Sequence, residues 1–237
     1  MKFANPTIHQ KTISSGFISI VFSIVIALFT ISAAISVPIL VRPFYYMQIS
    51  TLELENQTGY SYSTIKNAYD EMVDYCVGLS DDFGTGELLW SADGYSHFTD
   101  VRTLFLLDLR VLIGTSFTLL IMVILKKRFA KLKPRHFRGH TPAFYSAIGL
   151  LTVFCLIVVL AASDFNRAFV IFHHIFFPGK DNWLFNSDTD QIIKILPEQF
   201  FANCGIIIVG GIILMCAIYI MHSILQRRNM PKKNVAD

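Results

Sequence analysis

Charged residues are scarce in this sequence of 237 residues. Asp, Glu, Lys and Arg make up 16% of it, whereas a soluble domain carries about 25%. Apolar residues make up 53%, and the mean hydropathy is +0.51. The polar surface is too small to cover a soluble globule of this length, so the excess apolar surface needs lipid. The composition predicts one integral membrane domain over residues 1–237 rather than several soluble domains.

Several signatures of soluble enzymes are also missing. The four cysteines form no C-x-x-C pair, and the chain has no G-x-S-x-G elbow, no phosphate-binding glycine loop and no H-E-x-x-H motif. These absences argue against a serine hydrolase of the elbow type, a nucleotide-binding enzyme and a zinc protease of the helical-motif type. Histidines and carboxylates therefore remain as the candidate catalytic groups.

Four apolar stretches are long enough to cross a bilayer, for which an α-helix needs about 20 residues. They are residues 17–41, 104–125, 143–162 and 204–225. The first is longer than the apolar core of a signal peptide, about 7–15 residues, so we interpret it as a retained span. The sequence therefore predicts an all-α integral membrane protein with four transmembrane helices.

The distribution of charge predicts the orientation of these helices. Thirteen of the 20 Lys and Arg residues lie in the two terminal tails and in the link between the second and third stretches, with Asp237 as the single acid there. The other two links, 42–103 and 163–203, carry fifteen acids. Basic loops stay in the cytoplasm, so both termini are predicted to be cytoplasmic. The basic link is expected to meet anionic lipid rather than nucleic acid.

The two outer segments differ in pattern. Residues 62–77 in the first have apolar side chains at helical spacing, which predicts an amphipathic helix on or near the membrane. The second is crowded with aromatic residues around a turn at Pro178-Gly179. Because aromatic residues favour the membrane edge, this segment is expected to dip into the outer leaflet with irregular backbone.

Three histidines lie in these outer segments: His97, His173 and His174. Asp100 follows His97 by three residues, so on a helix it shares the face of His97 and can orient its ring. Asp108 lies only about 20° off the same face. The plainer alternative is that His97 and Asp100 anchor a helix at the interface. For His173 and His174, a buried structural role is as open as a catalytic one.

Two runs of sequence carry a resemblance to a known family. The first is His97-Phe98-Thr99-Asp100-Val101-Arg102, directly before the second span. The second comprises Phe172-His173, Phe176-Phe177-Pro178-Gly179, Asn182-Trp183-Leu184-Phe185 and Leu196-Pro197-Glu198-Gln199-Phe200-Phe201. In this order, and with four predicted spans and a long first outer link, they resemble the bacterial lipoprotein intramolecular transacylase family, called Lit.

The resemblance implies an acyltransferase of the bacterial cytoplasmic membrane whose active site faces the extracytoplasmic side. Its substrate would be a diacylated lipoprotein, and membrane lipid its surroundings. The acyl chain at the glycerol sn-2 position would move to the α-amino group of the lipid-modified cysteine, which leaves a lyso-form lipoprotein. Transfer from an ester to an amine is downhill, so no cofactor and no metal are expected.

By motif position, the resemblance implies that His97 and His173 are the catalytic pair, with His174 as the competitor of His173. Imidazole is a base near neutral pH. Our hypothesis is that His97, oriented by Asp100, activates the amine and that His173 polarises the carbonyl or protonates the leaving oxygen. The opposite division of roles stays open.

Four further residues are candidate supporting groups: Arg102, Asp108, Trp183 and Glu198. Glu198 would receive the substrate's α-ammonium group, or else would only favour the start of the fourth helix. Trp183 is expected to anchor the interface rather than to stack on substrate.

Two other functions stay open at this point. One is a metal-dependent membrane hydrolase, in which a zinc ion would bind among the outer histidines and Asp100. The other is a non-enzymatic module for binding or transport. A transporter is the less favoured of these, because transport pathways usually carry ionisable residues deep in the bilayer.

Overall fold

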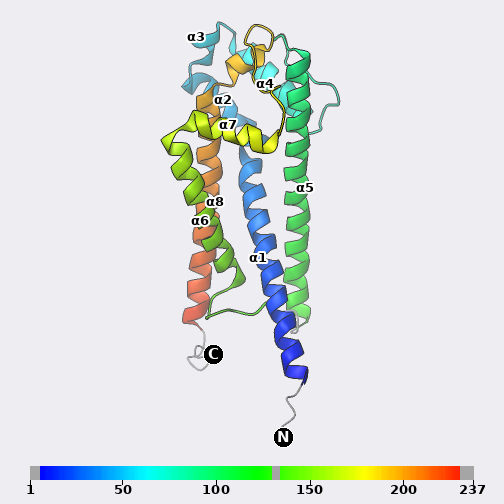
Figure 1. The fold of residues 1–237 in the computed structure, drawn as a ribbon, viewed down its shortest axis with the longest axis vertical. Coiled ribbons are helices and arrows are strands. Elements are labelled where there is room, and N and C mark those ends of the chain that lie inside the picture. Colours follow the sequence, from blue (N-terminus) through cyan, green and yellow to red (C-terminus); the bar gives the residue numbers. More distant parts are fainter. Residues whose placement is uncertain (1–5, 130–133, 230–237) are drawn as a thin grey trace. The chain divides into compact units, whose positions relative to one another are not determined.

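The computed structural model describes residues 6–129 and 134–229, with side chains from residue 15 onward. Its elements are α1 (Pro6–Leu40), α2 (Arg42–Thr51), α3 (Leu54–Thr58), α4 (Tyr62–Cys76), α5 (Ala92–Arg128), α6 (Pro142–Ser163), α7 (Phe165–Phe176), η2 (Gln191–Ile195) and α8 (Glu198–Arg228) (Figure 1). Within those two ranges there is no β-strand, only an isolated bridge between Phe137 and His140. The predicted all-α class is confirmed.

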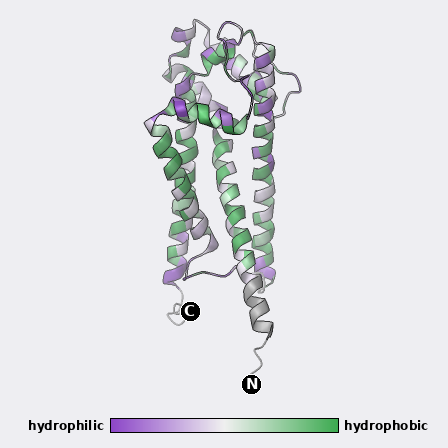
Figure 2. Ribbon diagram, in the orientation of Figure 1, coloured by the Kyte–Doolittle hydropathy of each residue, from purple (hydrophilic) through white to green (hydrophobic). Residues whose placement is uncertain are grey.

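Four helices of the described chain are long and apolar enough to cross a membrane: Ser15–Leu40 of α1, and α5, α6 and α8 (Figure 2). The prediction of four such helices is confirmed, although each helix extends beyond its apolar stretch. The extension is largest in α5, which has 37 residues and starts at Ala92. At 1.5 Å per residue it is about 55 Å long, and the hydrocarbon layer is about 30 Å thick. Part of α5 therefore extends beyond the hydrocarbon layer.

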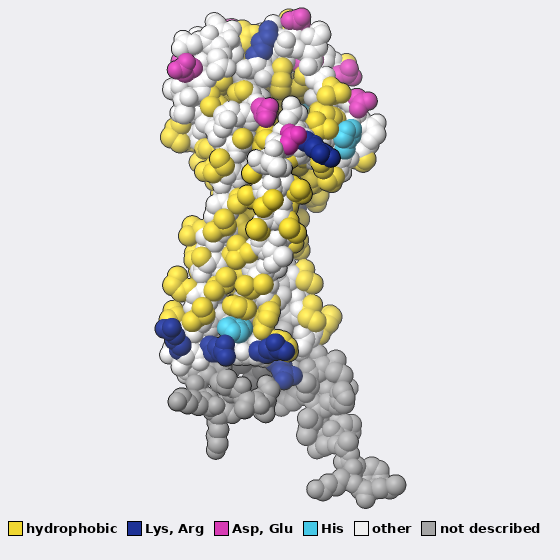
Figure 3. Space-filling model, turned by 60° about the vertical axis from the view of Figure 1, so that its left-hand side comes forward, with side chains coloured by type: hydrophobic (Ala, Val, Ile, Leu, Met, Phe, Trp, Pro, Cys, Tyr) yellow, Lys and Arg dark blue, Asp and Glu magenta, His cyan; other side chains and the backbone are white. Residues whose placement is uncertain are grey.

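The chain folds as two compact units. Unit 1 comprises residues 1–34, 111–155 and 210–237, and unit 2 comprises residues 35–110 and 156–209. Within unit 1, the Ser146 hydroxyl donates to the Ser23 carbonyl at 2.7 Å, and the Thr30 and Tyr219 hydroxyls lie 3.2 Å apart. Such polar contacts between helices satisfy groups that lipid cannot. The described part of unit 1 contains no acid, and its Lys and Arg side chains gather at one end (Figure 3).

The buried core of unit 2 is built from α2, α3, α4, the start of α5, η2 and the first turn of α8. Tyr45 and Tyr69 stack with ring centroids 3.6 Å apart, and Phe200 packs edge-on against Tyr45 at 5.3 Å. The Tyr45 hydroxyl donates to the Ile195 carbonyl at 2.8 Å, so its polar end is satisfied inside the core. This core fixes η2 and the start of α8 against α2 and α4.

A helix forms over the predicted amphipathic stretch, as α4. Ser61 caps it, because its hydroxyl accepts from the Thr64 amide at 3.1 Å. Along one face of α4, six side chains are at most 6% exposed: Ile65, Ala68, Tyr69, Met72, Val73 and Cys76. This face is covered by protein and does not rest on lipid. That α4 lies near the membrane stays a prediction.

The second outer segment contains a helix, α7, where irregular backbone was expected. The Asp164 side chain caps it by accepting from the Arg167 amide at 2.9 Å. A helix makes the backbone hydrogen bonds within the segment itself, which matters most near lipid, where no water is available to make them. Within unit 2, α7 runs across α8 rather than along it (Figure 1), and the Phe169 and Phe201 rings are 5.3 Å apart at the crossing.

Candidate active site

Two of the three outer histidines meet inside unit 2. His97 lies near the start of α5 and His173 in the last turn of α7. Their ring centroids are 5.8 Å apart, with an angle of 28° between the ring planes. The exposed fraction is 6% for His97 and 7% for His173. The two imidazoles are therefore buried side by side, close enough for one small reacting group to contact both.

Aromatic rings enclose this pair. The Phe177 ring lies 4.9 Å from the His97 ring and 5.6 Å from the His173 ring. Phe185 lies 5.3 Å from His97, and Trp183 stacks on His173 with centroids 4.5 Å apart. Such walls exclude water and lower the local dielectric, which strengthens any hydrogen bond made between them.

The chain turns back after α7 to complete these walls. The Phe177 amide donates to the His173 carbonyl at 2.7 Å, and Gly179 has a φ of 71°, which glycine adopts without a steric penalty. Trp183 is then only 9% exposed, and its Nε1 donates to the Lys180 carbonyl at 3.0 Å. The expectation that Trp183 anchors the membrane interface is wrong, because its ring packs against His173.

A backbone hydrogen bond orients the ring of His173. Its Nδ1 lies 2.8 Å from the Phe169 carbonyl oxygen. A carbonyl oxygen only accepts, so Nδ1 carries the proton and Nε2 holds the lone pair of the neutral ring. Burial lowers the pKa of His173 below its ordinary value, which favours this neutral form near pH 7. His173 is thus prepared to act as a base through Nε2.

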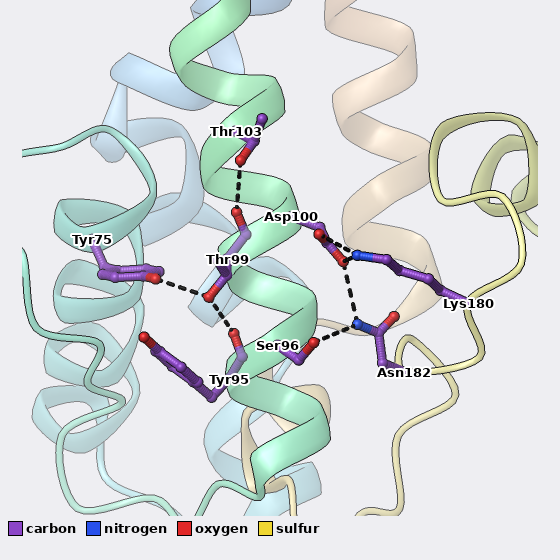
Figure 4. A network of polar contacts seen from close by, with 8 residues as sticks. All are labelled: Tyr75, Tyr95, Ser96, Thr99, Asp100, Thr103, Lys180 and Asn182. Atoms are coloured by element: carbon purple, nitrogen blue, oxygen red, sulfur yellow. Dashed lines mark hydrogen bonds and ion pairs between the residues drawn. The ribbon is translucent and has the colours of Figure 1, made fainter.

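His97 keeps a ring nitrogen without a partner. Its Nδ1 is buried and meets no hydrogen-bonding group among the described residues. The Asp100 carboxylate instead accepts from Lys180 Nζ at 2.6 and 2.7 Å and from Asn182 Nδ2 at 3.3 Å (Figure 4). The expectation that Asp100 orients His97 is therefore wrong. An ammonium group is the stronger donor to a carboxylate, and Lys180 supplies it.

The turn of α5 that carries His97 is held on two sides (Figure 4). On one side, Asn182 Nδ2 donates to the Ser96 hydroxyl at 3.1 Å. On the other, the Thr99 and Tyr75 hydroxyls lie 3.0 Å apart, which connects α5 to α4. These contacts restrict the position of His97 without touching its ring.

Asp190 secures the start of α5. Its carboxylate is 3% exposed and accepts from the Ser91 amide at 2.9 Å and from the Ser91 hydroxyl at 2.8 Å. The Ser91 hydroxyl in turn accepts from the Gly94 amide at 3.1 Å, as a helix cap does. The sequence analysis missed Asp190, because a partner 99 residues away leaves no local pattern.

The sequence analysis did not identify Lys180 as a site residue, and it noted Asn182 only as part of a motif. The sequence did contain one indication of the role of Lys180. It is one of three cations in the acid-rich segment 163–203 and directly follows the Pro178-Gly179 turn. A lysine so placed is expected to pair with a carboxylate, but which one depends on how the turn docks.

The remaining predicted residues hold the helices around the site. The Arg102 guanidinium donates to the Tyr75 carbonyl at 2.8 Å and pairs with Asp81 at 3.1 Å, so it fixes the loop after α4. The Asp108 carboxylate accepts from the Ser36 hydroxyl at 2.8 Å, which connects α5 to α1.

Burial separates His173 from His174. The His174 side chain is exposed, and its ring lies perpendicular to the Trp183 ring with centroids 5.8 Å apart. Glu198 is exposed in the first turn of α8, where a negative charge favours the helix start. Of the predicted candidates, the structure therefore brings together His97, His173 and Trp183.

Other kinds of chemistry find little support at this site. Within residues 6–129 and 134–229, no three His, Cys, Asp or Glu side chains form a group that could hold a metal ion. Burial raises the pKa of Cys76 to about 12, which keeps this thiol protonated and unreactive. The site offers two buried imidazoles in aromatic walls.

A family model described as lipoprotein intramolecular transacylase Lit matches residues 20–201, which is more than half of the chain. The chain belongs to the Lit family. It is therefore an acyltransferase, which decides against the metal-dependent hydrolase and the non-enzymatic module. No match was found among curated protein sequences.

Among solved structures, this Lit-family chain is similar to the membrane integral lipoprotein intramolecular transacylase Lit from Bacillus cereus. The two are 26% identical with a TM-score of 0.72, over 94% of this chain and 99% of that one. A variant of the B. cereus protein with one histidine replaced by arginine matches at 24% identity and a TM-score of 0.71, over 94% and 97%. A variant with alanine at that position matches at 23% identity and a TM-score of 0.74, over 94% of this chain and 100% of that one.

Proposed function

We propose that this Lit-family protein moves the sn-2 ester-linked acyl chain of a diacylglyceryl-cysteine lipoprotein to the α-amino group of the same cysteine. The product is a lyso-form lipoprotein. The observation that carries the proposal is the buried pair of His97 and His173, 5.8 Å apart between aromatic walls. Ester and amine belong to one molecule, so holding them in contact can supply up to about 7–11 kcal/mol of the barrier.

In this mechanism His173 moves the proton. Its Nε2 accepts a proton from the amine as nitrogen bonds to the ester carbonyl carbon. The same ring returns that proton to the glycerol oxygen as the carbon–oxygen bond breaks, so the proton count balances. This reverses our sequence-based hypothesis, in which His97 was the base. The reason is the contact of His173 Nδ1 with the Phe169 carbonyl, which leaves Nε2 as the basic nitrogen.

His97 stabilises the negative charge that develops on the carbonyl oxygen. As a neutral ring it has one N–H, which it donates to that oxygen. A donor already positioned in a dry site needs no rearrangement during the reaction, and such donors contribute about 2.7–4 kcal/mol in other acyl-transfer enzymes. The aromatic walls keep out water, which would otherwise hydrolyse the ester.

The acyl chains approach along α7. Four large apolar side chains of this helix are between 47% and 66% exposed: Ile171, Phe172, Ile175 and Phe176. Only Asp164 separates α7 from α6, so α7 starts where a membrane-spanning helix ends. This exposed face is suited to lipid of the outer leaflet, and His173 on the same helix then lies near the depth of the substrate's ester.

The orientation follows from charge. All described Lys and Arg residues of unit 1 lie in the predicted cytoplasmic segments, whereas unit 2 contains the acids. By the preference of basic loops for the cytoplasm, both termini are cytoplasmic and the histidine pair is extracytoplasmic. The chain is one membrane domain of the bacterial cytoplasmic membrane, with segments 42–103 and 163–203 outside. Both chain ends lie outside the described residues.

The proposal is tested by mass spectrometry of a synthetic diacylglyceryl-cysteine lipopeptide after incubation with the purified protein. Transacylation leaves the total mass unchanged, and fragmentation shows one acyl chain on nitrogen. Release of a free fatty acid would instead identify a hydrolase. A lipopeptide with an acetylated α-amino group is the matched control, because it keeps the ester but has no nucleophile.

The rate should depend on pH through two groups. The substrate's α-amino group has a pKa of about 7.7–8.0, so kcat/KM should rise with pH through that range as the free amine appears. Protonation of His173 removes the base at lower pH. Since burial lowers the pKa of His173, the slope of log kcat/KM against pH should steepen from one to two only below the ordinary histidine pKa of 6.5.

A His174→Gln variant provides the comparison for this profile. A charge on His174 lowers the pKa of His173, so removing it should move the steepening to a higher pH while activity at alkaline pH is kept. A steepening above pH 7 in the unaltered protein would contradict a buried neutral His173.

A further inference from the structure

A polar pocket of about 430 Å³ lies beside the turn of α5 that carries His97. Its five lining residues are Asp93, Ser96, Lys180, Asp181 and Asn182. Ser96 directly precedes His97 in α5, and Lys180 and Asn182 bond to Asp100 in the next turn (Figure 4). All five lining residues are polar, whereas the walls around the imidazoles are aromatic.

Asn182, one of the lining residues, has an acceptor without a donor. Asn182 Nδ2 donates to Asp100 and Ser96. A carboxylate oxygen only accepts, so the amide nitrogen must face it and the orientation of the carboxamide is decided. Asn182 Oδ1 then points elsewhere, and it is buried without a partner among the described residues. Such an atom needs a donor, and a peptide N–H is one.

The pocket also carries net negative charge. Lys180 is neutralised by Asp100, with its Nζ at 2.6 and 2.7 Å from the two carboxylate oxygens. Asp93 and Asp181 are exposed and have no cationic partner within the described chain. Two uncompensated carboxylates therefore face any molecule that enters.

We propose that this pocket binds the first peptide residues that follow the lipid-modified cysteine of the substrate, with a preference for cationic side chains. The inference rests on the proposed function. It concerns the peptide part of the substrate, whose polar groups do not suit the aromatic walls around the imidazoles. An N–H of that peptide donates to Asn182 Oδ1, while Asp93 and Asp181 attract Lys or Arg side chains. The acyl chains lie against apolar surface, the peptide lies in the polar pocket, and ester and amine lie between them.

The test compares diacylglyceryl-cysteine lipopeptides that differ only in the residues after the cysteine: Ser-Lys-Lys, Ser-Asn-Asn and Ser-Glu-Glu. The full-length protein in a neutral detergent should show kcat/KM about 5- to 20-fold higher for the Lys peptide than for the Glu peptide at low salt. Because the charges are exposed, this ratio should shrink as salt is added.

Substitutions then assign the preference to the pocket. The double variant Asp93→Asn, Asp181→Asn should reduce the ratio to about one, and Asp93→Lys, Asp181→Lys should reverse it. Asp188→Asn is the matched control, since Asp188 is exposed in the same outer segment but does not line the pocket. It should keep the ratio of the unaltered protein.

The outcomes separate the two proposals. Equal kcat/KM for the three peptides, or a preference that survives both double variants, would overturn the peptide pocket while transacylation stands. Failure of the unaltered protein to move the acyl chain of any peptide would overturn the proposed function itself. Should a double variant unfold, the salt dependence of the unaltered protein still decides, because a preference that salt does not change contradicts the charge argument.

Discussion

Replacing His173 by glutamine is expected to lower the rate of acyl transfer by about 10²–10⁴-fold, the usual contribution of a general acid–base group. Glutamine keeps a donor for the Phe169 carbonyl, which accepts from His173 Nδ1 at 2.8 Å, but it provides no basic nitrogen. The measurement is the single-turnover rate of the lipopeptide reaction at pH 8, followed by mass spectrometry.

The same experiment on His97 distinguishes its role. His97→Gln retains an N–H donor, so it should lose less activity than His97→Leu, which has none. The double variant of His97 and His173 should be little worse than His173→Gln, because groups that act in one step are not additive. His174→Gln is the control, since His174 is exposed. Equal losses for His173→Gln and His174→Gln would exclude the proposed base.

Replacing Asp190 by alanine is expected to destabilise the protein by about 2–4 kcal/mol, because it removes hydrogen bonds to a buried carboxylate worth about 1.5–3 kcal/mol each. The bonds come from the Ser91 amide and hydroxyl, at 2.9 and 2.8 Å. Since Ser91 caps the helix that carries His97, activity should also fall, by about tenfold or more. Thermal unfolding in detergent and the single-turnover rate measure the two effects.

Two further variants test this explanation. Gly94→Ala should resemble Asp190→Ala, because a Cβ at position 94 would lie 2.1 Å from Asp190 Oδ1 and displace the carboxylate. Asp190→Asn keeps a side-chain oxygen that can accept from the Ser91 amide and should recover part of the stability. If Asp190→Ala unfolds at the same temperature as an Asp188→Ala control, Asp190 does not secure α5.

The membrane class was predictable because it depends on local properties of the chain. Four apolar stretches of the required length appear whatever the tertiary fold, and they correspond to α1, α5, α6 and α8. Helix α7 was not predicted, although its cap at Asp164 was visible in the sequence. The aromatic crowding had been interpreted as a preference for the membrane edge, and that interpretation hid the helical spacing.

At the candidate site, single residues were easier to predict than their partners. His97 and His173 were selected from short motifs, and the structure buries them together. The partner of Asp100 was predicted from helical spacing to be His97, but it is Lys180, from a segment 80 residues away. Trp183 was expected at the interface, yet the turn at Gly179 directs it onto His173.

By itself the sequence determined the all-α class, the four membrane helices and the family. The length of an apolar stretch and the presence of a short motif depend only on the order of neighbouring residues. The tertiary structure alone decided which histidine is buried, which nitrogen of His173 is basic and which cation holds Asp100. Hydrogen bonding and burial depend on groups that lie far apart in sequence, and only folding brings them into contact.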